Sequence, residues 1–225
     1  MFTSIPKAIL FDWDNTLVDT WPLIHGGMCA VFENRGLTPW TLQQTKERCH
    51  ESARDAFPKL FPDDWQSAMD DFYKHVRAEH VSEIALLPFA RELIEHLATL
   101  DVLLGVVSNK TKDILVKEIE HLGFSEHFGV IVGSGDAVRD KPDAAPLLLA
   151  LDQLNVLPSM DVWMIGDTPA DWSSAKAAGV RAIGVGGVGM PEGDSMPDVM
   201  FLDLNPICNV LNDFSSVSFL KTKIS

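Results

Sequence analysis

Short aliphatic runs alternate regularly with longer amphipathic segments from residue 84 onward, and this alternation constrains the fold more than any other feature. Strands that alternate with helices are typical of βαβ units, so the pattern predicts an α/β protein with a doubly wound, Rossmann-like parallel sheet. We expect strands at about 7–12, 102–107, 129–133, 161–166 and 180–185, with a short one near 198–202. We expect helices at about 88–99, 111–122, 142–154 and 169–178, and a tail helix near 206–213. The first and fourth strands should be neighbours at the topological switch point.

Prolines and glycines support the helix ends. Pro142 and Pro169 suit the first turn of a helix, where a missing N–H costs nothing. Gly123 and Gly179 suit the position just after a helix end. Both kinds of signal therefore agree with the predicted helices.

The first connection interrupts the alternation. Roughly 90 residues separate the first strand from the second, although a crossover needs little more than a dozen. This segment contains three helical patterns, at Trp21–Asn34, Trp40–Ala56 and Trp65–His80, and no convincing strand. We therefore expect an all-helical cap domain at 20–82, inserted into a core domain made of 1–19 and 83–225. Such an insert would stand over the first strand end as a lid.

The first strand ends in two carboxylates, Asp12 and Asp14, which are one residue apart. Acids at the carboxyl end of a parallel strand lie where open α/β sheets bind their ligands. Side by side they repel one another unless a cation or a shared proton compensates. The arrangement indicates a metal-assisted site with one carboxylate as nucleophile and the other as acid and base.

Three further segments place polar residues after apolar runs. Ser108 and Asn109 offer a hydroxyl and backbone N–H groups at an expected strand-to-helix turn, which could hold an anion. Lys141 places an ammonium at an expected helix start, where it could neutralise a phosphate. Asp167 and Asp171 add two acids across a tight turn, and carboxylate oxygens suit Mg²⁺.

Composition and charge exclude several classes of partner. The formal charge of −14 and the pI near 4.7 argue against a nucleic-acid surface, which needs a basic stripe. No apolar stretch approaches the roughly 20 residues that span a bilayer, so we expect no membrane association. Three scattered cysteines, Cys29, Cys49 and Cys208, with no signal peptide, indicate a reducing compartment, so the expected location is the cytoplasm.

The order of these motifs resembles a known family. Asp-x-Asp-x-Thr-Leu, then Ser-Asn, then Lys-Pro, then Gly-Asp-x-x-x-Asp is similar to the haloacid dehalogenase (HAD) superfamily, within it the phosphoglycolate-phosphatase-like members with a helical cap. The likeness covers nearly the whole chain. It implies a Mg²⁺-dependent phosphatase that hydrolyses small phosphomonoesters through an aspartyl-phosphate.

The resemblance also implies roles for single residues. Asp12 would be the nucleophile, and Asp14 would protonate the leaving oxygen and then activate water. Ser108 and the N–H of Asn109 would hold the phosphoryl group, and Lys141 would balance charge on that group and on Asp12. Such roles fit phosphoryl transfer, in which positioning and charge neutralisation provide most of the catalysis.

The resemblance further implies the metal ligands. Asp12, the backbone carbonyl of Asp14 and Asp167 would bind Mg²⁺, and Asp171 would act directly or through water. In the cap, Trp21 near the hinge and Arg54 in the second expected helix are our candidates for substrate specificity. They could contact a second group of a short phosphorylated acid or a small sugar phosphate, phosphoglycolate among them.

Two other functions remain open from the sequence. A phosphomutase of the β-phosphoglucomutase type shares the same core residues, and a need for a sugar bisphosphate would reveal it. A catalytically silent metabolite-binding protein on the same scaffold would normally lack the nucleophile or a metal ligand, and here both are present. The physiological substrate is open, and either a monomer or a homodimer is compatible with the sequence.

Overall fold

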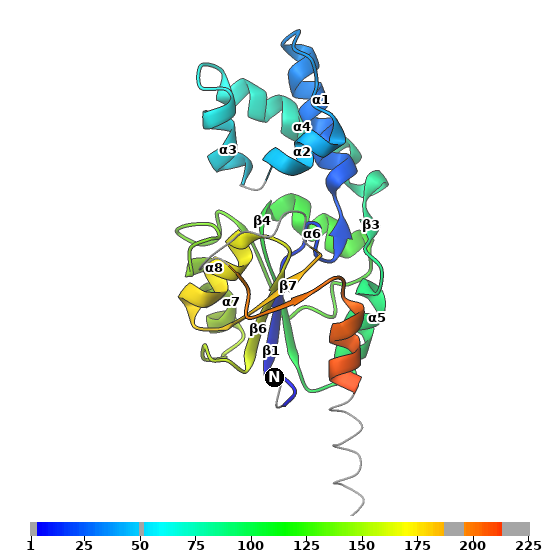
Figure 1. The fold of residues 1–225 in the computed structure, drawn as a ribbon, viewed down its shortest axis with the longest axis vertical. Coiled ribbons are helices and arrows are strands. Elements are labelled where there is room, and N and C mark those ends of the chain that lie inside the picture. Colours follow the sequence, from blue (N-terminus) through cyan, green and yellow to red (C-terminus); the bar gives the residue numbers. More distant parts are fainter. Residues whose placement is uncertain (1–3, 50–51, 187–195, 213–225) are drawn as a thin grey trace, which may run out of the picture.

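A computed structural model describes residues 4–49, 52–186 and 196–212. Its main sheet has six strands in the order β5–β4–β1–β6–β7–β8, and every pairing in it is parallel (Figure 1). The strands are β1 (Ala8–Phe11), β4 (Leu103–Thr111), β5 (Val130–Ser134), β6 (Val162–Gly166), β7 (Arg181–Val185) and β8 (Val199–Phe201). The predicted doubly wound sheet is confirmed, and β1 and β6 are neighbours as expected.

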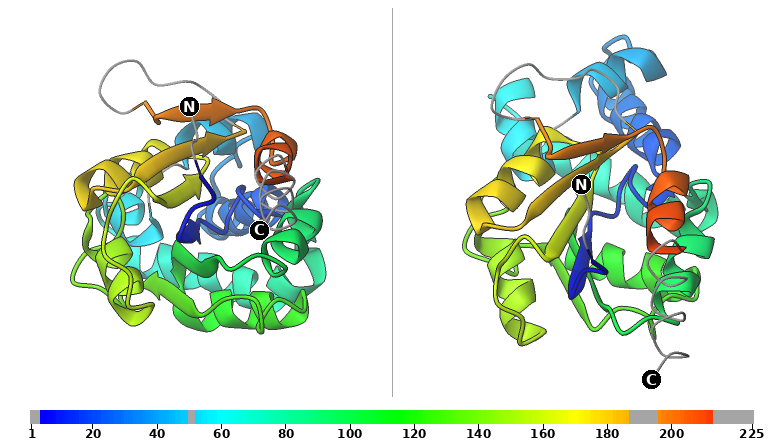
Figure 2. Two further views of the ribbon diagram at one scale, coloured as in Figure 1. Left: turned by 90° about the horizontal axis from the view of Figure 1, so that it is seen from below. Right: turned by 60° about the horizontal axis from the view of Figure 1, so that its bottom comes forward.

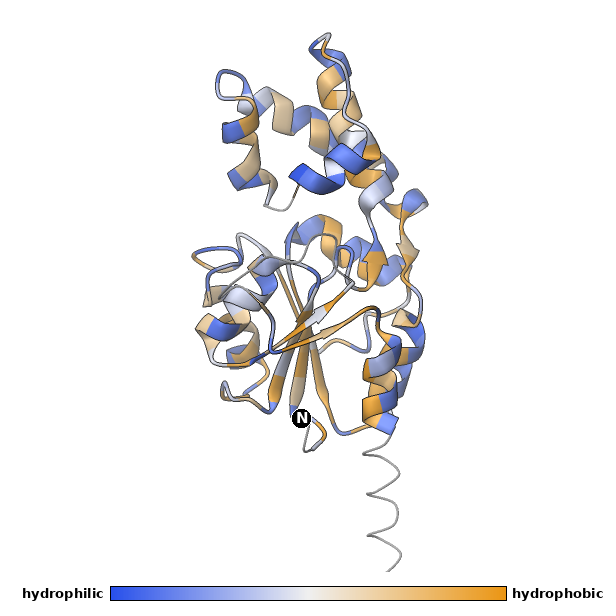
Figure 3. Ribbon diagram, viewed as in Figure 1, coloured by the Kyte–Doolittle hydropathy of each residue, from blue (hydrophilic) through white to orange (hydrophobic). Residues whose placement is uncertain are grey.

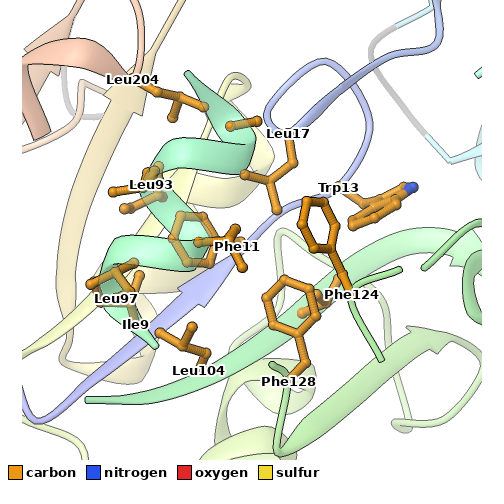
Figure 4. Packing of buried hydrophobic residues seen from close by; sticks show 14 of the residues in the cluster. Ile9, Phe11, Trp13, Leu17, Leu93, Leu97, Leu104, Phe124, Phe128 and Leu204 are labelled. Carbon is orange, nitrogen blue, oxygen red and sulfur yellow. The ribbon is translucent and has the colours of Figure 1, made fainter. Parts of the chain in front are cut away.

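Helices cover both faces of this sheet (Figure 2). They are α5 (Ala90–Leu97), α6 (Lys112–His121), α7 (Ala145–Gln153), α8 (Pro169–Ala178) and a helix over 205–212. Successive residues of a strand point to opposite faces. Ile9 and Phe11 therefore pack under α5, α6 and the helix over 205–212 (Figure 4), whereas Ala8 and Leu10 pack under α7 and α8.

Four helices between the first two sheet strands form a separate layer above the carboxyl end of the sheet (Figure 1). They are α1 (Trp21–Asn34), α2 (Leu42–Arg48), α3 (Ala53–Leu60) and α4 (Trp65–Glu83). Met28, Phe32 and Phe57 belong to a small core of their own. Figure 3 shows that α2 is largely hydrophilic, whereas the sheet strands are hydrophobic. We refer to α1–α4 as the helical insert.

Two short strands join the helical insert to the sheet. β2 (Val18–Asp19) and β3 (Ala85–Leu86) pair in the antiparallel direction. The sequence does not predict them, because a strand of two residues is too short to show a periodicity. They form a stem through which the chain enters and leaves the insert. Among the described residues, no helix combines the length and apolar composition of a membrane span.

The prediction of one helix over Trp40–Ala56 is wrong, because local caps divide it. The side chain of Thr41 accepts from the N–H of Gln44, whose side chain accepts from the N–H of Thr41, and α2 begins there. The side chain of Ser52 accepts from the N–H of Asp55 and starts α3. Each such cap satisfies N–H groups that a helix start leaves open.

The other helix ends agree with the sequence with one exception. Pro169 is the first residue of α8, and Gly123 and Gly179 follow their helices with φ of 78° and 74°. The prediction for Pro142 is wrong, because α7 begins three residues later and Pro146 takes the first-turn position. The Lys141–Pro142 segment, whose peptide bond is cis, instead forms a loop at the sheet edge.

Candidate active site

The polar residues predicted to share a site lie at the carboxyl edge of neighbouring strands. Asp12 follows β1 and its N–H donates to the carbonyl of Ile165, 2.8 Å away in β6. Asp167 directly follows β6. Ser108 and Asn109 lie on β4, the other neighbour of β1, where the strand continues to Thr111 with an irregular register. This edge is the topological switch point at which open α/β sheets bind ligands.

Lys141 connects two of the acids. Its Nζ lies 2.7 Å from Oδ1 of Asp12, 2.6 Å from Oδ1 of Asp171 and 2.7 Å from the carbonyl oxygen of Val107. Only 4% of the residue is exposed. Three acceptors satisfy all three N–H groups of the ammonium, so Lys141 belongs to the site and not to the surface.

The loop that carries Lys141 is fixed by two side chains. The amide of Asn109 donates to the carbonyl of Lys141 over 2.9 Å and accepts from its N–H over 3.0 Å. Asp140, which is buried, accepts from the hydroxyl of Ser134 over 2.8 Å and from the N–H of Gly135 over 3.2 Å. The sequence suggested the backbone N–H of Asn109 as an anion ligand, and the side chain of the same residue positions Lys141.

Burial and crowding of negative charge change the acidity of the acids. Burial raises the pKa of Asp12 to about 7; Asp171 and Asp14 add to this rise, and Lys141 opposes it. The pKa of Asp167 is also raised, by burial and then by Asp12 and Asp171. Burial disfavours the charge on Lys141, but Asp12 and Asp171 outweigh it and raise its pKa. One ammonium therefore does not compensate these carboxylates.

Three carboxylates are placed to share a cation. One oxygen each of Asp12, Asp167 and Asp171 lies within 4.8 Å of the others. Hard divalent cations such as Mg²⁺ prefer an all-oxygen donor set of this kind, and the uncompensated negative charge favours one. The donor chemistry therefore fits the predicted metal. The hydroxyl of Thr16, which was not predicted as a site residue, lies 3.3 Å from Oδ1 of Asp167 and orients it.

Asp171 is held at the first turn of α8. Its Oδ2 accepts from the N–H of Thr168 over 3.0 Å and from the Thr168 hydroxyl over 2.6 Å, while Oδ1 pairs with Lys141. Thr168 is the N-cap of α8, and these contacts form a capping box. The same carboxylate thus starts the helix and completes the site.

Asp14 does not join the three carboxylates. Its Oδ1 lies 2.6 Å from Nζ of Lys110, which also lies 2.7 Å from Oε2 of Glu118. The Asp14 side chain is therefore paired with Lys110 and is not one of the three carboxylates that lie close together. Lys110 directly follows Ser108 and Asn109, yet its role was not predicted, because its partner Glu118 lies on α6.

A cleft of about 1060 Å³ separates the helical insert from the sheet edge. Asn109, Lys141 and Asp167 are among the lining residues on the sheet side. Trp21, Lys46 and Lys59 are among those on the insert side, and Nζ of Lys46 lies 5.7 Å from the centre of the Trp21 ring. Ser108, also a predicted site residue, is buried beside a second hollow that Asp12, Asp14 and Trp21 also line.

Arg54, the second candidate for substrate specificity, contacts the loop that carries Lys141. The residues that line the cleft do not include it. Its Nη2 instead lies 3.4 Å from Oδ2 of Asp140, the buried residue next to Lys141, and its side chain is half exposed. Arg54 thus connects the insert to the loop that carries Lys141.

Comparisons with known proteins agree with this site. A family model described as haloacid dehalogenase-like hydrolase matches residues 9–185, which include all four motifs. A phosphoglycolate phosphatase from Chromobacterium violaceum is 30% identical over 189 residues, which cover 80% of this chain and 85% of that protein. A pyrophosphatase from Oceanobacillus iheyensis is 27% identical over 179 residues, which cover 80% and 83%.

A solved structure also resembles the chain. It is that of a HAD-superfamily hydrolase from Ehrlichia chaffeensis, with a TM-score of 0.67 and 27% sequence identity. The alignment covers 95% of this chain and 99% of that one. The likeness therefore includes the helical insert as well as the sheet.

Proposed function

The chain belongs to the haloacid dehalogenase-like hydrolase family, and we propose that it is a Mg²⁺-dependent phosphatase of small phosphomonoesters. One observation supports this above all: the buried ammonium of Lys141 joins Asp12 to Asp171 at the switch point, with Asp167 within reach of both. A nucleophile, a fixed positive charge and a set of oxygen ligands then lie around one point. Phosphoryl transfer needs these three elements.

In the first step, a carboxylate oxygen of Asp12 attacks the phosphorus atom and the bond from phosphorus to the ester oxygen breaks. Asp14 donates its proton to the departing oxygen, so the alcohol leaves neutral. Lys141 keeps Asp12 ionised against the effect of burial. The product is an acyl phosphate on Asp12.

In the second step, Asp14 accepts a proton from water, and the water oxygen attacks the phosphorus atom of the acyl phosphate. Inorganic phosphate leaves, Asp12 is regenerated, and Asp14 is protonated again for the next cycle. The hydroxyl of Ser108, the N–H of Asn109 and the ammonium of Lys141 hold the phosphoryl oxygens in both steps.

Mg²⁺ would be held by Asp12, Asp167 and the backbone carbonyl of Asp14, with Asp171 direct or through water. It would supply positive charge to neutralise the phosphoryl oxygens. These ligands leave the side chain of Asp14 free of the metal, in agreement with its pairing to Lys110.

The helical insert acts as a cap over this site and selects the substrate. Lys46 and Trp21 face the cleft and suit a second anionic group on a short substrate. Arg54 contributes to substrate selection indirectly, because its contact with Asp140 couples the helical insert to the loop that carries Lys141. Phosphoglycolate and small sugar phosphates fit these requirements, whereas a phosphoprotein would prevent the cap from excluding water.

A substrate panel tests the proposal. We expect phosphate release from phosphoglycolate, pyrophosphate or a small sugar phosphate, with kcat/KM well above that for a phosphopeptide. The phosphomutase alternative has less support, since the two relatives compared above are a phosphatase and a pyrophosphatase. A turnover that requires a sugar bisphosphate and releases no phosphate would favour it. Binding of the panel without turnover would favour a silent binding protein.

A further inference from the structure

We propose that Lys110 is a positioning residue that holds the carboxylate of Asp14 for proton transfer, and that Glu118 anchors Lys110. The inference rests on the proposed function, in which Asp14 protonates the leaving group. Lys110 and Glu118 are largely buried charged residues, and neither belongs to the group of three carboxylates that could share a cation.

The geometry around Lys110 supports this role. Its Nζ bridges Oδ1 of Asp14 at 2.6 Å and Oε2 of Glu118 at 2.7 Å, and only 9% of its side chain is exposed. A surface ion pair contributes little and leaves its partners mobile. A largely buried ammonium restrains both acids more strongly, because neither Lys110 nor the fully buried Glu118 can exchange its partner for water at low cost.

Glu118 is fully buried, and three groups surround its carboxylate. Besides Lys110, the indole N–H of Trp13 donates to Oε2 over 2.7 Å, and Nδ1 of His80 lies 3.3 Å from Oε1. Burial raises the pKa of Glu118 to about 7 in spite of Lys110. Keeping an acid here is therefore costly for stability, which a positioning role explains.

The contact with Trp13 links this anchor to the site itself. Trp13 is the residue between Asp12 and Asp14 in the sequence. Glu118 thus holds the backbone between the two acids through the indole, and it holds the second acid through Lys110. Both contacts act on the same short segment and orient Asp14 relative to Asp12.

The site has two lysine bridges of the same design. Lys141 joins Asp12 to Asp171 on α8, and Lys110 joins Asp14 to Glu118 on α6. Each ammonium connects an acid after β1 to an acid on a helix that covers the sheet. The bridges are separate, so the two acids are drawn to different partners. Asp14 is thereby kept away from the three carboxylates that suit the metal.

A leaving-group comparison tests the role of Lys110. We would measure kcat/KM, which includes only steps up to the departure of the leaving group, for phosphoglycolate and for 2,4-dinitrophenyl phosphate. The first leaving group needs a proton and the second does not. Lys110→Met should lower kcat/KM for phosphoglycolate by on the order of 10²-fold and change it by less than about threefold for the aryl ester, as expected from loss of a general acid.

A double-mutant cycle separates positioning from a structural effect. In an Asp14→Asn background, Lys110→Met should cause no further loss with phosphoglycolate, because Lys110 acts through Asp14. The double variant Lys110→Met/Glu118→Gln removes one charge of each sign, so it leaves no buried charge unpaired if the single variant fails to fold. It should also lose kcat/KM for phosphoglycolate and keep kcat/KM for the aryl ester. Lys112→Met is the matched control, since Lys112 pairs with Asp136 near the surface, and both rates should stay unchanged.

Equal losses for both substrates, or the same loss in the Asp14→Asn background, would overturn the inference. Failure of the proposed function has a different signature. It would appear in the wild-type protein as no phosphate release from either ester, whereas failure of this inference would appear only in the variants.

Discussion

The carboxylate of Asp171 fills the space in which a side chain on Gly166 would lie. A Cβ at Gly166 would overlap Cγ of Asp171, closer than such atoms approach in proteins. The carbonyl of Gly166 also accepts from the indole of Trp172 over 2.9 Å, so the backbone there cannot easily move. The glycine before Asp167 is therefore required for space.

Gly166→Ala should displace Asp171 from Lys141 and Thr168. We expect phosphate release to fall at least tenfold and stability to fall by about 1–3 kcal/mol, as for other overpacked sites. Gly36→Ala is the control, because its Cβ would meet no atom within 4 Å although its φ is 63°. It should lose about 1 kcal/mol of stability and keep full activity. Wild-type activity in Gly166→Ala would contradict the crowding argument.

Asp12→Asn should abolish turnover and keep the fold. No other acid can form the acyl phosphate, so we expect a rate at least about 10³-fold lower. Phosphate release is measured beside Asp161→Asn, a surface control whose carboxylate pairs only loosely with Lys7 at 3.6 Å. Retention of a tenth of the wild-type rate in Asp12→Asn would refute its assignment as nucleophile.

Chelation should silence the enzyme. Excess EDTA should stop phosphate release and Mg²⁺ should restore it, whereas Ca²⁺, which is larger and looser in geometry, should restore it poorly. Mg²⁺ should also raise the Tm of the wild-type protein, and less so for Asp167→Asn, because a ligand is lost. Full activity in EDTA would rule out the metal site.

Lys46→Ala should affect binding more than chemistry. We expect KM for phosphoglycolate to rise about tenfold, equivalent to ~1.4 kcal/mol, with kcat little changed. An aryl phosphate that lacks a second anionic group is the control substrate, and its KM should stay the same. Arg54→Ala should have a smaller effect on KM, since its guanidinium contacts Asp140. If Arg54→Ala raised KM more than Lys46→Ala, Arg54 would be the specificity residue that the sequence suggested.

Glu118 should make stability depend on pH. Its pKa rises from 4.5 to about 7 on folding because of burial, so the folded protein binds this proton more tightly than the unfolded chain. The contribution of this proton to the stability of the folded protein is therefore largest below pH 4.5 and is lost as the pH rises to about 7. The side chain of the Glu118→Gln variant does not titrate. The free energy of unfolding of this variant, relative to that of wild type, should therefore rise by on the order of 2–3 kcal/mol between about pH 5 and pH 8.

The measurement for Glu118 is urea unfolding of both proteins at these two pH values without Mg²⁺. Asp113→Asn, also on α6 but half exposed and paired with Arg77, serves as control. A difference between Glu118→Gln and wild type that is the same at both pH values would show that the burial of this carboxylate does not raise its pKa.

The sequence predicted the parts of the site that follow from strand order. Asp12 and Asp167 meet because parallel strands β1 and β6 end at one edge, and strand ends are visible in the hydropathy pattern. The pair of Lys110 and Glu118 joins a strand to a helix, and such a contact depends on how α6 packs. A signal did exist, since Glu118 shares the buried face of α6 with Ile114 and Leu115, where an acid is unusual.

The division of α2 from α3 was also missed for a physical reason. The segment after Arg48 contains no proline or glycine, so the hydropathy pattern continues through it. The caps at Thr41 and Ser52 are visible in the sequence, but such residues are common inside longer helical patterns too. Only the folded chain shows which of them accept an N–H.

The stem of β2 and β3 makes the helical insert, in topological terms, a single long loop of the sheet. Its entrance and exit are hydrogen-bonded neighbours, Val18 with Leu86 and Asp19 with Ala85. The segment between these two strands can be lengthened, shortened or replaced without changing the order or the connections of the sheet strands. Divergence of substrate preference among relatives therefore needs no change at the carboxylates, and a graft at this stem is the natural way to transfer one preference to another scaffold.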